Sequence, residues 1–190
     1  MGLILSEGKI ELKDHVLKVL TEYPEQILDK KQLQRFLGSL NYIRYFYENQ
    51  AKDIRCLQKW LKKDVPWTEA MTKVVQIIKQ KVQNLPKLYL PNTSLPFILE
   101  TDASDEVQAG VLLQKHTQSE EVSMYAYGCF KGDEISYPSS HKEILAVKNG
   151  IKRFRLFLKP VHFIVRTDLK HMKGMLKNHK ILEQGNNQVL

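Results

Sequence analysis

Cysteine is scarce in this sequence, and the positions of the two cysteines exclude several kinds of site. Cys56 and Cys129 lie far apart, and neither has a partner at the spacing of a zinc-binding pair. This usage argues against a zinc site and is typical of proteins from reducing compartments. No apolar run approaches the roughly 18 residues of a membrane span, so we expect no membrane partner. The N-terminal MGLILSEGK turns acidic too early for a secretory signal.

Positive charge is in excess, and it is unevenly distributed. Of the net charge of +8, residues 1–90 account for +6 and residues 91–190 for +2. A basic first half indicates a polyanionic partner, because contacts to phosphates supply most of the non-specific affinity for nucleic acids. The apolar fraction of 43% is enough to build a core in 190 residues.

The first half of the chain has the pattern of a hairpin followed by helices. Residues 3–12 predict two short strands around Ser6-Glu7-Gly8. Asp14, Asp29 and Thr68 occupy the N-cap positions of three helical stretches, which end near residues 23, 63 and 84. We expect a break in the second stretch near Asn49-Gln50.

Three prolines then mark a linker. Pro86, Pro91 and Pro96 follow the last of these helical stretches. We therefore expect two domains, a mostly helical segment with an N-terminal hairpin at residues 1–88 and a second domain at residues 89–190.

The second half alternates strands with helices. The pattern predicts strands at 96–102, 107–114, 122–130 and 161–168, a helix at 139–158 and a helix-like stretch at 169–179. Three meander strands, a crossover helix and a further strand indicate an α/β unit with a mixed sheet.

Carboxylates stand at the ends of two of these strands. FILETD ends in Thr101-Asp102, and HFIVRTD ends in Thr167-Asp168. If the strands are parallel, both aspartates emerge at the carboxyl edge, where open α/β sheets bind ligands. Glu143 shares a helix face with Val147, so it is expected at the same edge. Three converging carboxylates repel one another unless cations neutralise them, and oxygen ligands favour Mg²⁺ or Mn²⁺.

Each acid also has a simpler interpretation. Asp102 could begin a turn, Asp168 could cap the following helix, and Glu143 could be a first-turn acid favoured by the helix dipole. Glu100 shares a strand face with Asp102, and it either supports the site or forms a surface ion pair. The repeated pattern favours a common site over three coincidences.

Several separated motifs resemble one known family. ETDASDEVQAGVLL, YPSSHKEILAVKNGIKRFRLFL and VHFIVRTD resemble, in order and spacing, the RNase H domain of reverse transcriptases. They are most similar to plant pararetroviruses (Caulimoviridae, with badnavirus-like and rice tungro bacilliform-type members) and to gypsy-type retrotransposons. DKKQLQRFLGSLNYIRYF resembles the thumb helices after the polymerase palm, and VPWTEAMTKV resembles the connection segment.

The resemblance implies a fold and an activity. It implies an RNase H-like mixed five-strand-type sheet, with Asp102, Glu143 and Asp168 as catalytic and metal-binding acids. Two Mg²⁺ ions, with Mn²⁺ as an alternative, would serve the cleavage of the RNA strand of an RNA–DNA hybrid.

The sequence also departs from the family pattern. The family has a fourth metal-binding aspartate downstream, and Glu183 comes too early to replace it. We therefore expect the RNase H domain to lack its C-terminal part, with the chain ending before the last strand. A polymerase motif of the YxDD type is absent. The expected partners are therefore the rest of a viral polyprotein, in the host cytoplasm or the virion and not secreted.

The basic helical stretch is the expected duplex-binding surface. The residues expected to bind the primer–template duplex are Lys9, Lys30, Lys31, Gln34, Arg35, Asn41 and Tyr42. The alternative is that these residues form the ordinary solvated face of an amphipathic helix. At the level of the whole chain, an active nuclease and a non-catalytic hybrid-binding tether both remain open.

Overall fold

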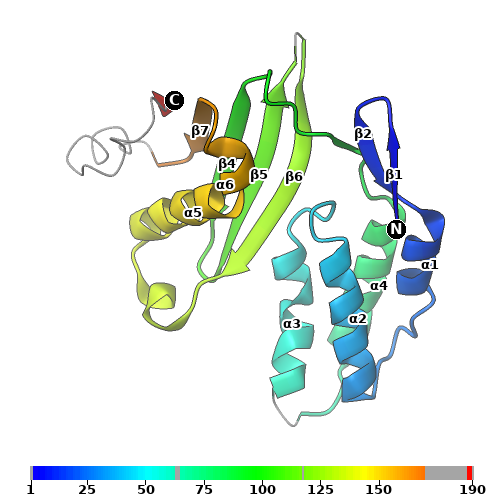
Figure 1. Cartoon of the computed structure of the whole chain (residues 1–190). Coiled ribbons are helices and arrows are strands. Elements are labelled where there is room, and N and C mark those ends of the chain that lie inside the picture. Colours follow the sequence, from blue (N-terminus) through cyan, green and yellow to red (C-terminus); the bar gives the residue numbers. More distant parts are fainter. Residues whose placement is uncertain (1, 63–64, 117, 170–187, 190) are drawn as a thin grey trace. The chain divides into compact units, whose positions relative to one another are not determined.

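The computed structural model describes residues 2–62, 65–116, 118–169 and 188–189. The chain divides into two compact units, Met1–Leu88 and Tyr89–Leu190 (Figure 1). The border lies between Pro86 and Pro91. Of the helix-like stretch expected at 169–179, only Leu169 is described, and it is not helical; the rest of the stretch and Glu183 lie outside the described residues.

The first unit starts with a β-hairpin and continues with four helices. Its elements are β1 (Leu3–Ser6), β2 (Lys9–Leu12), α1 (Asp14–Thr21), α2 (Lys30–Tyr42), α3 (Gln50–Lys62) and α4 (Glu69–Gln83). The hairpin is confirmed: β1 and β2 are antiparallel, and Glu7 and Gly8 turn the chain with φ of 49° and 74°. The two-residue strand β3 (Leu88–Tyr89) adds a third strand, which the sequence pattern did not predict.

Two of the three predicted helix caps are confirmed. The Asp29 side chain accepts a hydrogen bond from the Lys31 N–H at 2.9 Å, and Thr68 caps α4 through the Met71 N–H. The prediction for Asp14 is wrong, because Asp14 is the first residue of α1 and Lys13 is the N-cap. The Lys13 N–H donates to the Gly2 carbonyl, which holds Lys13 in an extended conformation at that point.

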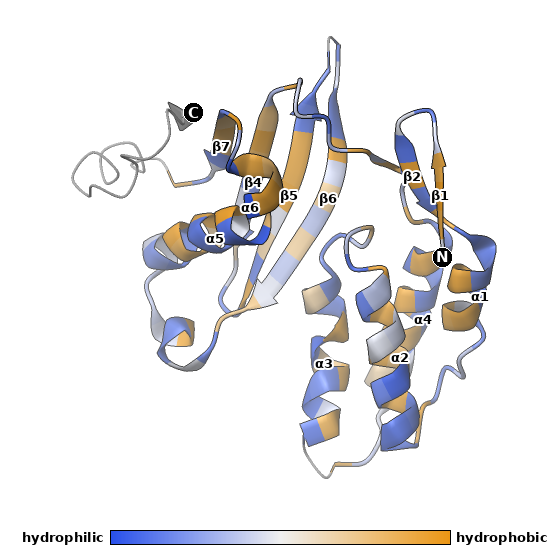
Figure 2. Ribbon diagram, viewed as in Figure 1, coloured by the Kyte–Doolittle hydropathy of each residue, from blue (hydrophilic) through white to orange (hydrophobic). Residues whose placement is uncertain are grey.

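The predicted break in the second helical stretch is present and wider than expected. It separates α2, which ends at Tyr42, from α3, which starts at Gln50. The fully buried Gln50 side chain donates to the Leu40 carbonyl at 2.8 Å and so satisfies a carbonyl of the last helical turn. In Figure 2 the helices of this unit each carry both apolar and polar residues, as helices with one buried face do.

The second unit is a five-stranded mixed sheet with a helix on one face. Its elements are β4 (Phe97–Ala103), β5 (Val107–Lys115), β6 (Glu120–Cys129), the 3₁₀ helix η1 (Gly132–Ser136), α5 (Ser139–Arg153), α6 (Arg155–Leu158), β7 (Phe163–Thr167) and β8 (Gln188–Val189). The strand order is β6-β5-β4-β7-β8. Strand β5 is antiparallel to both of its neighbours, β4 and β6, and β7 is parallel to β4. The predicted fold class is therefore confirmed.

The core of this unit lies between the sheet and α5. Phe97, Leu99 and Leu112 of the sheet pack with Val147 and Phe154 into one apolar cluster. The helix expected at 139–158 is two helices, because the backbone changes direction at the buried Phe154. This packing fixes α5 against β4, the central strand, and its neighbour β5.

The end of the chain corrects one expectation. We expected the chain to end before the last strand, but the backbone of Gln188 and Val189 pairs in parallel with Ile164 and Val165 of β7. Two residues are too short for an alternating pattern to reveal a strand, so only pairing with an existing edge identifies it.

Candidate functional site

The two aspartates predicted from the strand ends occupy equivalent positions in the sheet. Thr101 of β4 and Thr167 of β7 form the last register pair of these parallel strands, and Asp102 and Asp168 follow them directly. Both aspartates are exposed. Adjacent strands lie about 4.8 Å apart, so the parallel pairing brings both carboxylates to one edge of the sheet.

The third predicted acid, Glu143, approaches the same edge from α5. It lies in the first turns of the helix and is only 8% exposed. Two helical turns further on, on the same face of α5, Gly150 packs against the sheet. A β-carbon at this position would lie 3.2 Å from the Thr101 side chain and 3.3 Å from that of Leu99. Glycine therefore lets α5 lie close to β4, and this close approach places Glu143 beside the strand ends.

Glu143 contacts both strands that carry the aspartates. The Ala103 backbone on β4 hydrogen-bonds the Glu143 carboxylate, and the Thr167 hydroxyl on β7 donates to its Oε2 at 3.4 Å. Burial raises the pKa of Glu143, and the charges of Asp102 and Asp168 raise it further. Glu143 is therefore within electrostatic range of both aspartates.

The three carboxylates have the chemistry of a site for a hard divalent cation. All donors are oxygens, which Mg²⁺ and Mn²⁺ prefer, and the raised pKa of Glu143 marks negative charge that a cation would offset. The donor types therefore match Mg²⁺ or Mn²⁺. Among the described residues, however, no group of three His, Cys, Asp or Glu side chains is arranged so that it could hold a metal ion.

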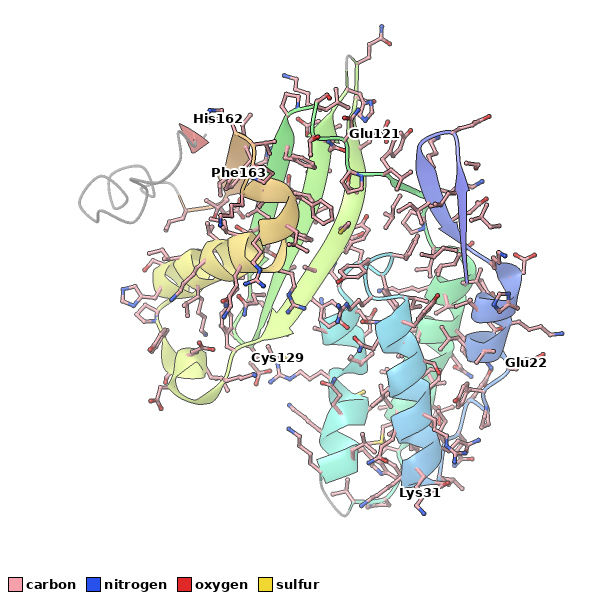
Figure 3. All side chains as sticks on the ribbon, in the orientation of Figure 1. Glu22, Lys31, Glu121, Cys129, His162 and Phe163 are labelled. Carbon is pink, nitrogen blue, oxygen red and sulfur yellow. The ribbon has the colours of Figure 1, made fainter. Side chains whose placement is uncertain are left out.

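The predicted duplex-binding residues of α2 are exposed. The exposed residues are Lys30, Lys31, Gln34, Arg35, Asn41 and Tyr42. In Figure 3 the side chain of Lys31 projects from the first turn of α2. Gly38, which sequence reasoning did not single out, is exposed between Gln34 and Asn41 and has no atom within 4 Å of the position of a β-carbon.

Two of these predicted residues also have structural roles. The Tyr42 hydroxyl accepts a hydrogen bond from the Gly2 N–H at 3.3 Å, although Tyr42 remains 54% exposed. The Lys30 ammonium lies 5.7 Å from the centre of the Trp60 ring. Lys9, at the start of β2, is half-buried.

A family model identifies the second half of the chain. The model of the "RNase H-like domain found in reverse transcriptase" matches residues 67–165, slightly more than half of the chain. The chain belongs to this family of RNase H-like domains.

Caulimovirus polyproteins are similar to nearly the whole chain. The enzymatic polyprotein of Cauliflower mosaic virus (strain Strasbourg) is 40% identical over 187 residues, which cover 95% of this chain and 28% of the polyprotein. That of Figwort mosaic virus (strain DxS) is 40% identical over 180 residues, 93% of this chain and 27% of the polyprotein. The genome polyprotein of Petunia vein clearing virus is 38% identical over 192 residues, 100% of this chain and 9% of the polyprotein. The chain thus spans less than a third of each of these relatives.

Solved structures share the fold. The foamy viral protease-reverse transcriptase in complex with RNA/DNA hybrid matches with a TM-score of 0.75 and 18% identity, over 100% of this chain and 28% of that one. The same enzyme in complex with dsDNA matches with a TM-score of 0.75 and 17% identity, over 100% of this chain and 44% of that one. At these identities the matches establish the fold alone.

In the RNase H-like domain, Glu100 forms an ion pair and is not part of the cluster of three acids. Of the two interpretations open for this residue, the surface ion pair is correct: Arg166 Nη1 lies 2.9 Å from Glu100 Oε2. Arg166 also donates two hydrogen bonds of 3.0 Å to Glu120. Glu100 therefore pairs with the Arg166 guanidinium on the face of the sheet opposite α5.

Sequence reasoning missed two residues beside the site. Lys142 is 7% exposed, lies over the Phe130 ring, and its ammonium is 3.9 Å from Asp105 in the turn after β4. Thr167 bonds Glu143 directly. The repeated Thr-Asp dipeptide was a signal for Thr167, whereas nothing in the sequence distinguishes Lys142 from an ordinary surface lysine.

None of the helices formed by the described residues is both long enough and apolar enough to cross a membrane. The two cysteines of the RNase H-like chain are free thiols, and Cys129 stands at the exposed end of β6 (Figure 3).

Proposed function

We propose that this chain is the part of a viral reverse transcriptase that hydrolyses the RNA strand of RNA–DNA hybrids. The reaction is an endonucleolytic cleavage that depends on Mg²⁺. The observation that carries the proposal is the approach of Asp102, Glu143 and Asp168 to one sheet edge, with the pKa of Glu143 raised partly by the two aspartates. Membership of the RNase H-like family supports the same assignment.

The three acids would hold the metal. Two divalent ions at such a cluster supply an activated water and stabilise charge on the leaving oxygen. Asp102 and Asp168 present exposed carboxylates from neighbouring strands, while the buried Glu143 offers a carboxylate held by hydrogen bonds from both strands. A 2′-hydroxyl on the substrate is the feature by which such a site distinguishes RNA from DNA.

The exposed face of α2 would bind the duplex. Lys31 and Arg35 offer charge to phosphates, and the bare backbone at Gly38 permits close approach of a sugar–phosphate chain between Gln34 and Asn41. Contacts of this kind position a duplex without reading its sequence. Solved relatives in complex with an RNA/DNA hybrid and with dsDNA support this proposal.

Cleavage of a labelled hybrid tests the catalytic proposal. The full chain with Mg²⁺ should cut the RNA strand, and Asp102→Asn or Glu143→Gln should reduce the rate by more than the 10–100-fold typical for residues that only orient ligands. Glu121→Gln, on β6 and outside the cluster, is the matched control and should cut normally. Cleavage that persists in both site variants would overturn the proposal.

A non-catalytic tether is the second candidate. It is favoured by the finding that no group of three His, Cys, Asp or Glu side chains among the described residues is arranged to hold a metal ion. As a tether, the chain would bind hybrid in a salt-sensitive way and cut nothing, even with Mg²⁺ or Mn²⁺. Binding and cleavage measured on the same hybrid distinguish the two candidates.

We further propose that the chain works within a larger polyprotein. The partners would be polymerase palm and fingers segments and further RNase H residues, in the host cytoplasm or the virion. The 28% of a caulimovirus polyprotein that the chain spans supports this proposal. Recovery of polymerase segments with this chain from infected plant cells would test it, and consistent recovery of the chain alone would contradict it.

A further inference from the structure

Two threonines occupy equivalent places at the catalytic edge but use their hydroxyls differently. Thr101 and Thr167 are register partners on β4 and β7, and each directly precedes an aspartate. The Thr167 hydroxyl donates to Glu143 at 3.4 Å. The Thr101 hydroxyl is buried and has no hydrogen-bond partner among the described residues.

The hydrogen bonds of Thr167 indicate which of its contacts receives the hydroxyl proton. The Leu169 N–H donates to Thr167 Oγ1 at 3.5 Å, so the oxygen acts as an acceptor on that side. Its own proton is then available for the Glu143 carboxylate. Both contacts are longer than the usual hydrogen-bond distances, so each is weak.

Thr167 completes a two-point hold on Glu143. The carboxylate is bonded from the Ala103 backbone on β4 and from the Thr167 side chain on β7. A glutamate side chain has several rotatable bonds, so one contact would leave the carboxylate free to turn away. Bonds from both strands hold it at the sheet edge, within electrostatic range of Asp102 and Asp168.

We propose that Thr167 is a positioning residue that holds the Glu143 carboxylate in the orientation needed to bind a divalent cation. The inference rests on the proposed function, since it assumes that the three acids bind such an ion. Groups that orient a ligand typically change metal affinity by about 10–100-fold when they are removed. With a long and half-buried bond, Thr167 belongs at the lower end of that range.

The sheet provides a matched control. Thr167→Val removes the hydroxyl and keeps the shape of the side chain. Thr101→Val makes the same change one strand away, at a hydroxyl without a partner, where removal should be neutral or stabilising. Thr167→Ser keeps the hydroxyl and loses only a methyl group.

Mn²⁺ binding to the full chain, without nucleic acid, tests the inference. Electron paramagnetic resonance of free Mn²⁺ gives the affinity, and circular dichroism checks the fold of each variant. Thr167→Val should bind about tenfold more weakly than wild type, while Thr167→Ser and Thr101→Val should bind as wild type does. Thr167→Ala replaces Thr167→Val if the valine variant does not fold.

Each remaining outcome overturns a different claim. A folded Thr167→Val with wild-type affinity overturns the positioning role and leaves the proposed function standing. Equal losses in Thr101→Val and Thr167→Val also overturn it, since packing would then explain both. If the wild-type chain binds no Mn²⁺, the proposed metal-dependent function fails as well.

Discussion

Glu100 of β4 and Arg166 of β7 are register partners, and their Oε2 and Nη1 atoms lie 2.9 Å apart. The next register pair is Thr101 and Thr167, which point to the opposite face of the sheet, toward α5. A single step along the strands thus leads from a surface ion pair to two threonines that face α5. Alternation of side chains across a strand accounts for this change of face.

Loss of the Arg166 ion pairs should have a small effect on stability. Arg166→Met removes bonds to Glu100 and Glu120, but all three side chains are exposed by a third or more. Exposed ion pairs typically contribute about 0.2–1 kcal/mol, so we expect a loss of about 1 kcal/mol in urea unfolding. The loss should shrink at high salt. The exposed Arg155→Met is the control, and a loss that stays undiminished at high salt would contradict the assignment of these contacts as surface ion pairs.

Removing the charge of Glu143 should stabilise the metal-free chain at neutral pH. Burial and the nearby aspartates raise the pKa of Glu143, so the folded state holds this proton to a higher pH than the unfolded state does. Stability therefore falls as pH rises from the ordinary glutamate pKa through the raised value. Glu143→Gln avoids that loss.

Thermal unfolding in a chelating buffer measures this effect. At pH 7 Glu143→Gln should melt at a higher temperature than wild type, and the difference should shrink at pH 4, where wild-type Glu143 is largely protonated. The control is Glu121→Gln, which removes an acid on β6. Its melting temperature should not show this pH-dependent difference from wild type. A Glu143→Gln chain that melts lower than wild type at pH 7 would show that the carboxylate is not strained by its neighbours.

Gln114 fixes the proline-containing linker to the sheet. Its fully buried side chain accepts a hydrogen bond from the Asn92 N–H at 2.8 Å and donates to the Asn92 carbonyl at 2.6 Å. Gln114→Leu loses both bonds and should cost about 1–3 kcal/mol. Limited proteolysis should cut near Thr93-Ser94 faster in the variant. Gln108→Leu, also on β5, is the control, and equal proteolysis rates would contradict this role.

Gly38→Ala should separate stability from duplex binding. Gly38 is exposed within α2 and has open space around it, so alanine should stabilise the helix by about 0.5–1 kcal/mol. If the duplex approaches the backbone here, the added methyl group should weaken hybrid binding. Chemical unfolding and fluorescence anisotropy measure the two effects. Unchanged or tighter binding would remove Gly38 from the proposed interface.

Local patterns in the sequence predicted most elements of both units. The caps at Asp29 and Thr68 were correct, because capping depends on residues only two or three positions away. The strands of the second unit and the parallel relation of β7 to β4 followed from alternation and a crossover helix. β3 and β8 were not predictable, since each has only two residues and exists through its pairing.

The sequence by itself determined which acids stand at one edge of the sheet, since Asp102, Glu143 and Asp168 follow from strand ends and one helix face. Only the tertiary structure decided how their neighbours act. Thr101 and Thr167 share the same dipeptide, yet only Thr167 bonds Glu143. Glu100 could have joined the cluster, and Arg166 holds it elsewhere. A side chain's partner depends on residues distant in the chain, and these meet only when the sheet is paired and the helix is packed on it.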